Sequence, residues 1–268
     1  MEKEYSAKNT IDRIIEEKIP CIFVSPHLDD AILSAGDLIS FLSKRTEVKV
    51  VNVFTEPSPR PYTLSAKAFL SQCGYKDANL LFDDRIREDR QVFLRLNIDP
   101  VYLGFVDATW RKITNMGFIR RILSNIIPEL GHVYPVFRIN ISDGKASSRD
   151  AELIRDLESK LKSIGESHPK SIVFCPLALR THVDHTIVRD ACLKVFQDNL
   201  ILWSDFPYSL KNKVSLQNLG KMRLTSFEWS NDHDGKKKLI EGYESQFKGL
   251  FPDSKINLNP ETYYLVSK

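Results

Sequence analysis

The pattern of elements in residues 21–54 constrains the fold more than any other feature of the chain. The apolar run Cys21–Val24 is short and contains β-branched residues, as is typical of a buried strand. Apolar residues then recur at steps of three and four over residues 32–42, which predicts a helix, and Val48–Phe54 gives a valine-rich second strand. Strand, helix and strand in this order form a unit with parallel strands and a right-handed crossover. We therefore predict an α/β protein with a mostly parallel sheet flanked by helices.

Two polar turns occupy equivalent places in this pattern. Pro26-His27-Leu28-Asp29-Asp30 lies between the first strand and its helix, and Arg180-Thr181-His182-Val183-Asp184-His185 lies between the predicted strand Ser171–Leu177 and the next helix. In open α/β sheets, ligands bind in the crevice outside the carboxyl ends of the strands. The first turn on its own has a structural alternative, in which Asp29 or Asp30 caps the helix and His27 is a satisfied turn residue. The recurrence of histidine and aspartate at both strand ends favours a functional site.

Three side chains from these turns could form a set of two histidines and one aspartate. Zinc accepts imidazole nitrogen and carboxylate oxygen and keeps an open position in catalytic sites, whereas the same set also suits non-heme Fe²⁺. Bound zinc lowers the pKa of its water toward about 7, and a second carboxylate can act as general base. His182 and His185 are three residues apart, so one could bind metal while the other faces the substrate carbonyl.

The rest of the chain is assigned more coarsely. Residues 108–146 are predicted to be a variable, substrate-facing segment, because long loops in compact domains are usually functional or disordered. The other predicted elements are a helix over residues 7–17, a weak helix over Ser65–Phe82, a helix over Arg85–Leu96, a strand over Val101–Phe105, a short helix over Ile119–Ile127, an amphipathic helix over Ser148–Ile164, a strand over Met222–Trp229 and a helix over Lys236–Leu250.

Composition narrows the class of protein. The net charge of +3 and the scattered basic residues argue against nucleic acid, and Lys236–Lys238 is interpreted as a solvated helix end. No C-x-x-C pair occurs in the sequence. We interpret the four cysteines as reduced thiols: Cys21, Cys73, Cys175 and Cys192. Neither a signal peptide nor a membrane-spanning stretch is found, so we expect a cytoplasmic protein with a single domain over residues 1–268. A homo-oligomer is left open.

The chain resembles the PIG-L/LmbE-like family of metal-dependent N-deacetylases, which act mainly on N-acetylglucosaminyl compounds. The family's P/A-H-P-D-D motif is matched by Pro26–Asp30, and its H-x-x-H motif by His182–His185. Further similarity lies in Arg85–Asp89, Asp205–Tyr208 and Tyr243–Gln246, so the resemblance spans most of residues 19–265. It implies a Rossmann-like fold with the active site at the carboxyl ends of the strands.

The resemblance also implies roles for individual residues. His27, Asp30 and His185 would be the ligands of Zn²⁺, with Fe²⁺ as an alternative metal. Asp29 would be the general base on the metal-bound water. His182 would be the protonated partner of the tetrahedral intermediate, and Asp184 would orient a nearby histidine. Arg85 or Arg87 would hold the substrate, although both could equally be exposed helix residues paired with acids.

Two departures from the family pattern leave this set intact. Leu28 replaces a common proline and Ala31 a frequent glutamate, but neither change removes a ligand or the base. The leading hypothesis is therefore a zinc hydrolase that removes the acetyl group from a small N-acetylated amino sugar. The alternatives are a deacylase of non-sugar amides and a non-catalytic small-molecule binding module. Nucleotide chemistry is disfavoured because neither a G-x-G-x-x-G nor a Walker A sequence is found.

Overall fold

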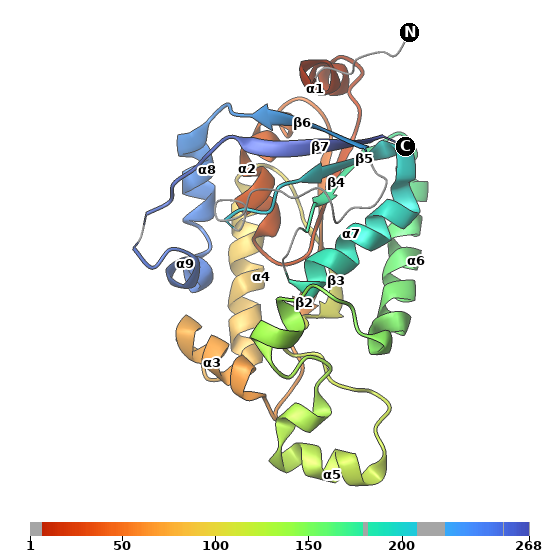
Figure 1. Ribbon diagram of the computed structural model, residues 1–268. Coiled ribbons are helices and arrows are strands. Elements are labelled where there is room, and N and C mark those ends of the chain that lie inside the picture. Colours follow the sequence, from red (N-terminus) through yellow and green to blue (C-terminus); the bar gives the residue numbers. More distant parts are fainter. Residues whose placement is uncertain (1–6, 179–181, 208–222, 254, 268) are drawn as a thin grey trace.

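The strands form one sheet, in which the parallel part carries the predicted site. The computed structural model describes residues 7–178, 182–207, 223–253 and 255–267. Within these residues, seven strands pair in the order β3-β2-β1-β4-β5-β7-β6 (Figure 1). Their bounds are β1 Cys21–Ser25, β2 Val48–Glu56, β3 Val101–Val106, β4 Ile172–Pro176, β5 Leu200–Trp203, β6 Arg223–Trp229 and β7 Glu261–Ser267. The first five strands in this order are parallel, and β7 runs antiparallel to both β5 and β6. The predicted α/β class with a mostly parallel sheet is confirmed.

Helices cover both faces of the sheet, and each face has its own core. The helices are α1 Ala7–Glu16, α2 Asp30–Leu42, α3 Leu64–Cys73, α4 Ala78–Leu94, α5 Phe118–Ile126, α6 Ala151–Ser167, α7 Val183–Phe196, α8 His233–Ile240 and α9 Glu244–Leu250. Alternate residues of β1 point to opposite faces. Phe23 packs in the core that includes α2 and α8, whereas Ile22 and Val24 pack in the core that includes α6 and α7. This two-sided burial explains why β1 is an unbroken apolar run.

The order of the strands places the two polar turns side by side. The chain runs from β1 outward to β2 and β3, and then returns to add β4 and β5 on the other side of β1. β1 pairs with β4 in parallel register, with Phe23 opposite Phe174. The turns that follow β1 and β4 therefore meet at the point where the strand order reverses, which is where open α/β sheets bind ligands.

The structure corrects three assignments made from the sequence. The sequence predicts a weak helix over Ser65–Phe82 and a second helix over Arg85–Leu96. In the structure this region consists of α3 and α4, and α3 ends at Gly74, where φ is +81°. The predicted helix Lys236–Leu250 is likewise divided into α8 and α9, and β7 was not predicted. Lys236 is not solvated, because it is buried and its Nζ lies 2.7 Å from Glu261 Oε1. Glu261 also accepts hydrogen bonds from the backbone amides at the middle of α2, so its carboxylate ties β7 to both α8 and α2.

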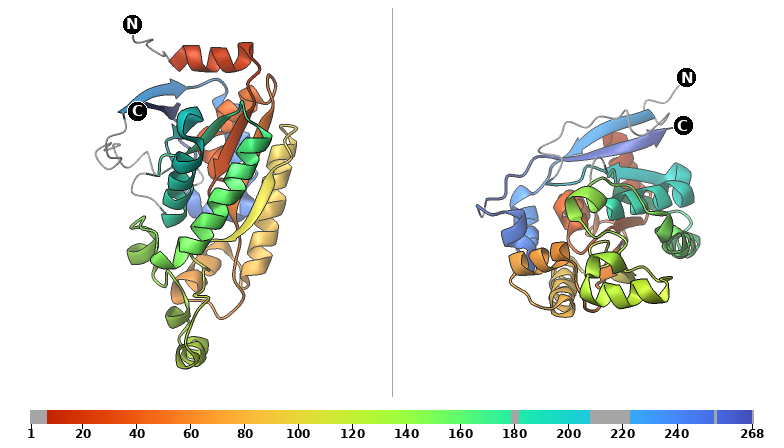
Figure 2. Two further views of the ribbon diagram at one scale, coloured as in Figure 1. Left: turned by 90° about the vertical axis from the view of Figure 1, so that its right-hand side faces the viewer. Right: turned by 60° about the horizontal axis from the view of Figure 1, so that its bottom comes forward.

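Residues 108–146 hold little regular structure, as predicted. They contain α5, a 3₁₀ turn at Pro128–Gly131 and a single π-helical turn at Phe137–Ile141. In two orientations, α5 lies at the extremity of the molecule, away from the sheet (Figures 1 and 2). No helix of the described residues is long and apolar enough to cross a membrane. The single-domain interpretation stays a prediction.

Candidate metal centre and active site

The turn after β1 presents its carboxylates to a crevice instead of capping α2 with them. Asp29 occupies the N-cap position, but its side chain makes no capping hydrogen bond and its φ is +151°. A positive φ is unusual for a residue other than glycine, and such backbone strain concentrates at functional sites. Ser25 takes over the capping role, because its Oγ accepts a hydrogen bond from the amide of Ala31. The structural alternative of a simple capped turn is therefore not what the structure shows.

Three side chains from the two turns converge on one point. Asp30 Oδ2 lies 3.0 Å from His27 Nδ1 and 3.1 Å from His185 Nε2, and all three residues are buried. These two nitrogens and one oxygen lie close enough together to hold a single metal ion. The donor set is the one expected for zinc or non-heme iron. The structure thus brings together the three residues predicted as ligands.

A second carboxylate supports each of the two histidines. His185 Nδ1 lies 2.7 Å from Asp205 Oδ1, and Asp205 Oδ2 accepts a hydrogen bond from the amide of Ala178. His27 Nε2 lies 3.2 Å from Asp184 Oδ2. A carboxylate on the far nitrogen fixes the ring orientation and tautomer of a metal-binding histidine. Sequence reasoning had placed Asp205 only within a recurring segment, whose last residue, Tyr208, lies outside the described residues.

The charges around this centre favour binding of a cation. Burial disfavours the charged form of His27, but hydrogen bonds to Asp184 and Asp30 outweigh it and raise the pKa of this imidazole to about 9. Burial also opposes ionisation of Asp30, yet His185 and His27 hold the pKa of its carboxyl well below the usual range. In the metal-free protein, protons on the imidazoles therefore balance an ionised Asp30. A divalent metal that binds here has to displace them.

Asp29 lies beside the centre in a different environment. It is buried, and Nη2 of Arg85 lies 3.9 Å from Asp29 Oδ1. Burial and the charge of Asp30 raise the pKa of Asp29 to about 7, although Arg85 opposes the shift. A carboxyl group with a pKa near neutrality is suited to accept and return a proton. Arg87, the other predicted substrate-binding residue, is exposed on α4 and pairs with Asp84, so the structure does not bring it to the site.

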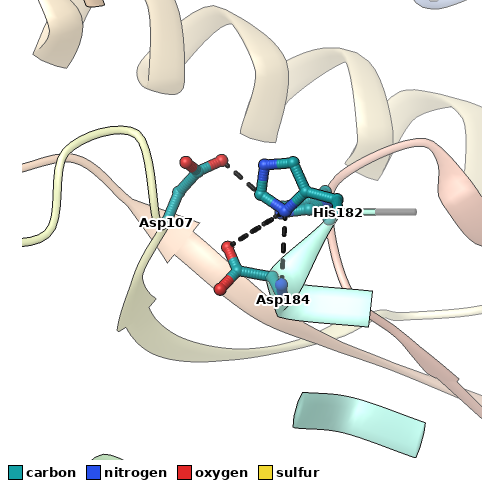
Figure 3. A group of neighbouring side chains, drawn as sticks. Asp107, His182 and Asp184 are labelled. Carbon is teal, nitrogen blue, oxygen red and sulfur yellow. Dashed lines mark hydrogen bonds and ion pairs between the residues drawn. The ribbon is translucent and has the colours of Figure 1, made fainter. Parts of the chain in front are cut away.

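His182 and two carboxylates form the other side of the site. Asp107 and Asp184 point toward the ring of His182 (Figure 3). Nδ1 of this ring lies 3.3 Å from the amide nitrogen of Asp184 and 3.7 Å from its Oδ2. Burial and the neighbouring charge of His27 lower the pKa of His182 to about 4. The imidazole is therefore neutral in the metal-free protein, whereas the resemblance implied a protonated one.

Arg111 holds Asp184 in its ionised form. Its Nη2 lies 2.5 Å from Asp184 Oδ1, and Asp184 Oδ2 accepts a hydrogen bond from the amide of Ala108. Burial would raise the pKa of Asp184, but Arg111 and His27 hold it below the usual range. Sequence reasoning did not find Arg111, because it lies in the variable segment and belongs to no motif.

A buried hydrogen-bond network lies behind Asp29. Asp89 accepts hydrogen bonds from Asn52 Nδ2, Tyr102 Oη and Tyr243 Oη at 2.8, 3.0 and 2.9 Å. Burial raises the pKa of Asp89 to about 7 despite these bonds and the charge of Arg85. Asp89 and Tyr243 belong to segments that carried the family resemblance, but nothing in the sequence pattern indicated that they meet.

The support that Asp205 gives to His185 leads to a prediction. We expect Asp205→Asn to weaken metal binding by about 10- to 100-fold, because the amide keeps the hydrogen-bond geometry but removes the charge that strengthens the imidazole as a ligand. Competition with a chromophoric chelator measures the affinity. Asp190→Asn is the matched control, because Asp190 is an exposed aspartate that pairs with Arg189. An unchanged affinity in Asp205→Asn would show that the contact is structural only.

Comparison with known proteins finds a matching family and similar deacetylases. Residues 22–196 match the family described as PIG-L, GlcNAc-PI de-N-acetylase. The chain is 26% identical to 2'-N-acetylparomamine deacetylase of Niallia circulans, with 90% of this chain and 87% of that protein covered. A deacetylase of the teicoplanin biosynthesis pathway has a similar fold, with a TM-score of 0.73, 22% identity and coverage of 92% of this chain and 98% of that one. The zinc-inhibited form of teicoplanin deacetylase Orf2 gives a TM-score of 0.72 at 21% identity, with the same coverage.

Proposed function

Because the chain belongs to the PIG-L family, described as GlcNAc-PI de-N-acetylase, we propose that it is a metal-dependent hydrolase that removes the acetyl group from an N-acetylated amino sugar and releases acetate and a free amine. One observation carries the proposal: His27, Asp30 and His185 converge as a ligand set, with the buried carboxyl of Asp29 beside them. The relative from Niallia circulans, which acts on an N-acetylated amino sugar, supports the substrate class.

We assign the metal to His27 Nδ1, Asp30 Oδ2 and His185 Nε2. Two imidazoles and one carboxylate suit Zn²⁺ first and Fe²⁺ second. When bound, such a metal would polarise the amide carbonyl and lower the pKa of a water molecule. Asp205 and Asp184 would orient the two imidazoles through their far nitrogens.

The protein's own side chains would move the proton and stabilise the developing charge. Asp29 would take a proton from the attacking water as the new C–O bond forms. The same residue would return the proton to the amine nitrogen as the C–N bond breaks, so that acetic acid and a neutral amine form, and the acid's remaining proton then passes to the amine to give acetate and an ammonium group. A carboxyl with a pKa near neutrality can perform both transfers. Arg85 would keep Asp29 in place through its charge at 3.9 Å, and it could also contact the sugar.

His182 would donate a hydrogen bond to the carbonyl oxygen. The amide of Asp184 donates a hydrogen bond to Nδ1, so in the neutral ring Nε2 would carry the proton. A preorganised donor to the oxyanion stabilises the transition state more than the ground state. We therefore retain for His182 a role as oxyanion donor, without requiring an imidazolium.

Release of acetate tests this function directly. The zinc-loaded protein is incubated with a panel of N-acetylated amino sugars and, in parallel, with N-acetylated amines that lack a sugar. We expect acetate to be released from members of the sugar series, together with one equivalent of free amine. Release from the non-sugar series alone would favour the alternative deacylase, and metal binding without any hydrolysis would favour a binding module.

We further propose that the protein works in the cytoplasm. The support is the state of its cysteines, since all four are free and Cys21, Cys175 and Cys192 are buried. Free thiols persist in reducing compartments. Mass spectrometry after alkylation of protein taken directly from cells would show whether they are reduced there.

A further inference from the structure

Helix α5 turns an apolar face outward. Its six apolar positions, including the residue that follows the helix, are all exposed, and Ile119 and Ile126 reach 73% and 76% exposure. These positions are Phe118, Ile119, Ile122, Leu123, Ile126 and Ile127. At 100° per residue they form one continuous stripe. An apolar stripe normally faces the core of a protein. In this helix it faces solvent instead.

One residue on the other side of the same helix packs against the protein. Ser124 lies opposite the apolar stripe, and it is 8% exposed. It contacts Gly131 so closely that a Cβ added there would approach Ser124 Cβ to 2.8 Å. Among the described residues, α5 thus packs on the protein at Ser124, and its large apolar side has no partner.

A neighbouring turn extends this surface to the active site. Phe137 and Ile139 are exposed by 43% and 70%, and the ring of Phe137 lies 5.9 Å from the ring of His182. The amide of Phe137 donates a hydrogen bond to Ser65 Oγ, which fixes the turn to the start of α3. Residues 113–141, which we name the arm, therefore connect the extremity of the molecule to the site.

The charges of the arm favour an anionic partner over a second copy of the chain. The arm contains Arg120, Arg121 and Arg138 but only one acid, Glu129, whose carboxylate accepts a hydrogen bond from the amide of Leu64. A two-fold contact between copies would bring the same arginines together, and like charges placed face to face are unfavourable. The phosphates of an anionic lipid surface would complement them.

We propose that the arm docks the protein on an anionic lipid surface, with the apolar stripe of α5 inserted at the boundary between headgroups and acyl chains. A helix with a large apolar face and flanking arginines lies in the plane of such an interface, and its affinity combines buried apolar area with attraction to anionic headgroups. The position of α5 at one extremity suits insertion into a planar surface (Figures 1 and 2). This docking does not depend on the proposed hydrolysis.

Flotation of the full-length protein with vesicles tests the proposal. We expect the protein to float with vesicles of phosphatidylcholine mixed with phosphatidylglycerol, to bind vesicles of phosphatidylcholine alone more weakly, and to be released by salt. Ile119→Glu combined with Ile126→Glu should lower partitioning at least about tenfold. Arg121→Gln combined with Arg138→Gln should weaken binding to the mixed vesicles only.

The matched control places the same change on another helix. Leu80→Glu with Leu94→Glu replaces two apolar residues on α4 that are exposed by 61% and 54%, and it should leave vesicle binding unchanged. Equal losses in both double variants, or no binding by the wild-type protein, would overturn the proposal. Light scattering measures the oligomeric state. If the wild-type protein is a dimer and the Ile119→Glu, Ile126→Glu variant is a monomer, the stripe binds a second copy of the chain instead.

Discussion

Asp29→Asn is expected to retain metal and to lose turnover by about three orders of magnitude, because general acid–base catalysis by one side chain contributes about 10²- to 10⁴-fold. The amide occupies the same volume but can neither take a proton from water nor return one to the amine. Asp29 is not among the three side chains that converge as the ligand set, so the metal should stay. Metal content by elemental analysis and kcat for acetate release are measured on the same preparation.

The choice of asparagine matters because of the backbone at this residue. The φ of +151° at Asp29 is unfavourable for most side chains, and asparagine tolerates positive φ better than alanine does. A loss of activity in Asp29→Asn therefore reflects chemistry rather than a collapsed turn, which the thermal midpoint would verify. Asp99→Asn serves as the control, because Asp99 is an exposed aspartate that pairs with Arg90. If Asp29→Asn keeps most of its turnover, another group must be the base.

The pH dependence of the two carboxyls explains why only one of them is assigned this role. His185 and His27 hold the pKa of Asp30 below its usual range despite burial, which favours the anion that the proposed ligand role requires. Asp29 has a pKa raised to about 7, because its burial and the charge of Asp30 outweigh Arg85. Adjacent carboxyl groups with well-separated pKa values commonly mark an acid–base residue and its charged neighbour.

The site residues that the sequence predicts are those whose positions follow from the order and direction of the strands. His27, Asp30 and His185 lie in turns that follow β1 and β4, and parallel pairing of these strands is enough to bring the turns to one edge of the sheet. Asp205 and Arg111 are different, because Asp205 reaches His185 from a loop and Arg111 reaches Asp184 from the variable segment. Their positions depend on how those segments fold back, which no period in the sequence encodes.

In the fold, too, hydrophobic periodicity predicts most elements, whereas features that depend on tertiary contacts are missed. The apolar runs of β1, β2 and β4 are recognisable because both faces of the sheet are covered by helices. β7 lies beyond a polar stretch and was not predicted, although it pairs with both β5 and β6 and begins at Glu261. The buried ion pair of Glu261 with Lys236 was missed because a lysine run is ordinarily solvated. Helix α5 was predicted, but its periodicity did not indicate that the apolar face points outward.

Removal of the metal is expected to abolish acetate release, and Asp30→Ala is expected to prevent reloading. Asp30 Oδ2 is the atom shared by the set, since it lies 3.0 Å from His27 Nδ1 and 3.1 Å from His185 Nε2. Without it, the set keeps two imidazoles but no carboxylate to hold a divalent cation. Treatment with a chelator and dialysis against zinc should restore metal and turnover in the wild-type protein, whereas Asp30→Ala should show neither.

The metal affinity itself should depend on pH in a defined direction. Hydrogen bonds to Asp184 and Asp30 outweigh burial and raise the pKa of His27 to about 9, so at neutral pH the metal-free protein carries a proton where the metal has to bind. Affinity should therefore rise with pH up to about 9 and fall by up to about tenfold per unit below it for each proton displaced. Titration calorimetry in buffers of different ionisation enthalpy measures the protons released. Binding without proton release at pH 7 would mean that His27 is not a ligand.

Retention of zinc by Asp30→Ala, at the affinity of the surface control Asp190→Ala, would place the metal elsewhere.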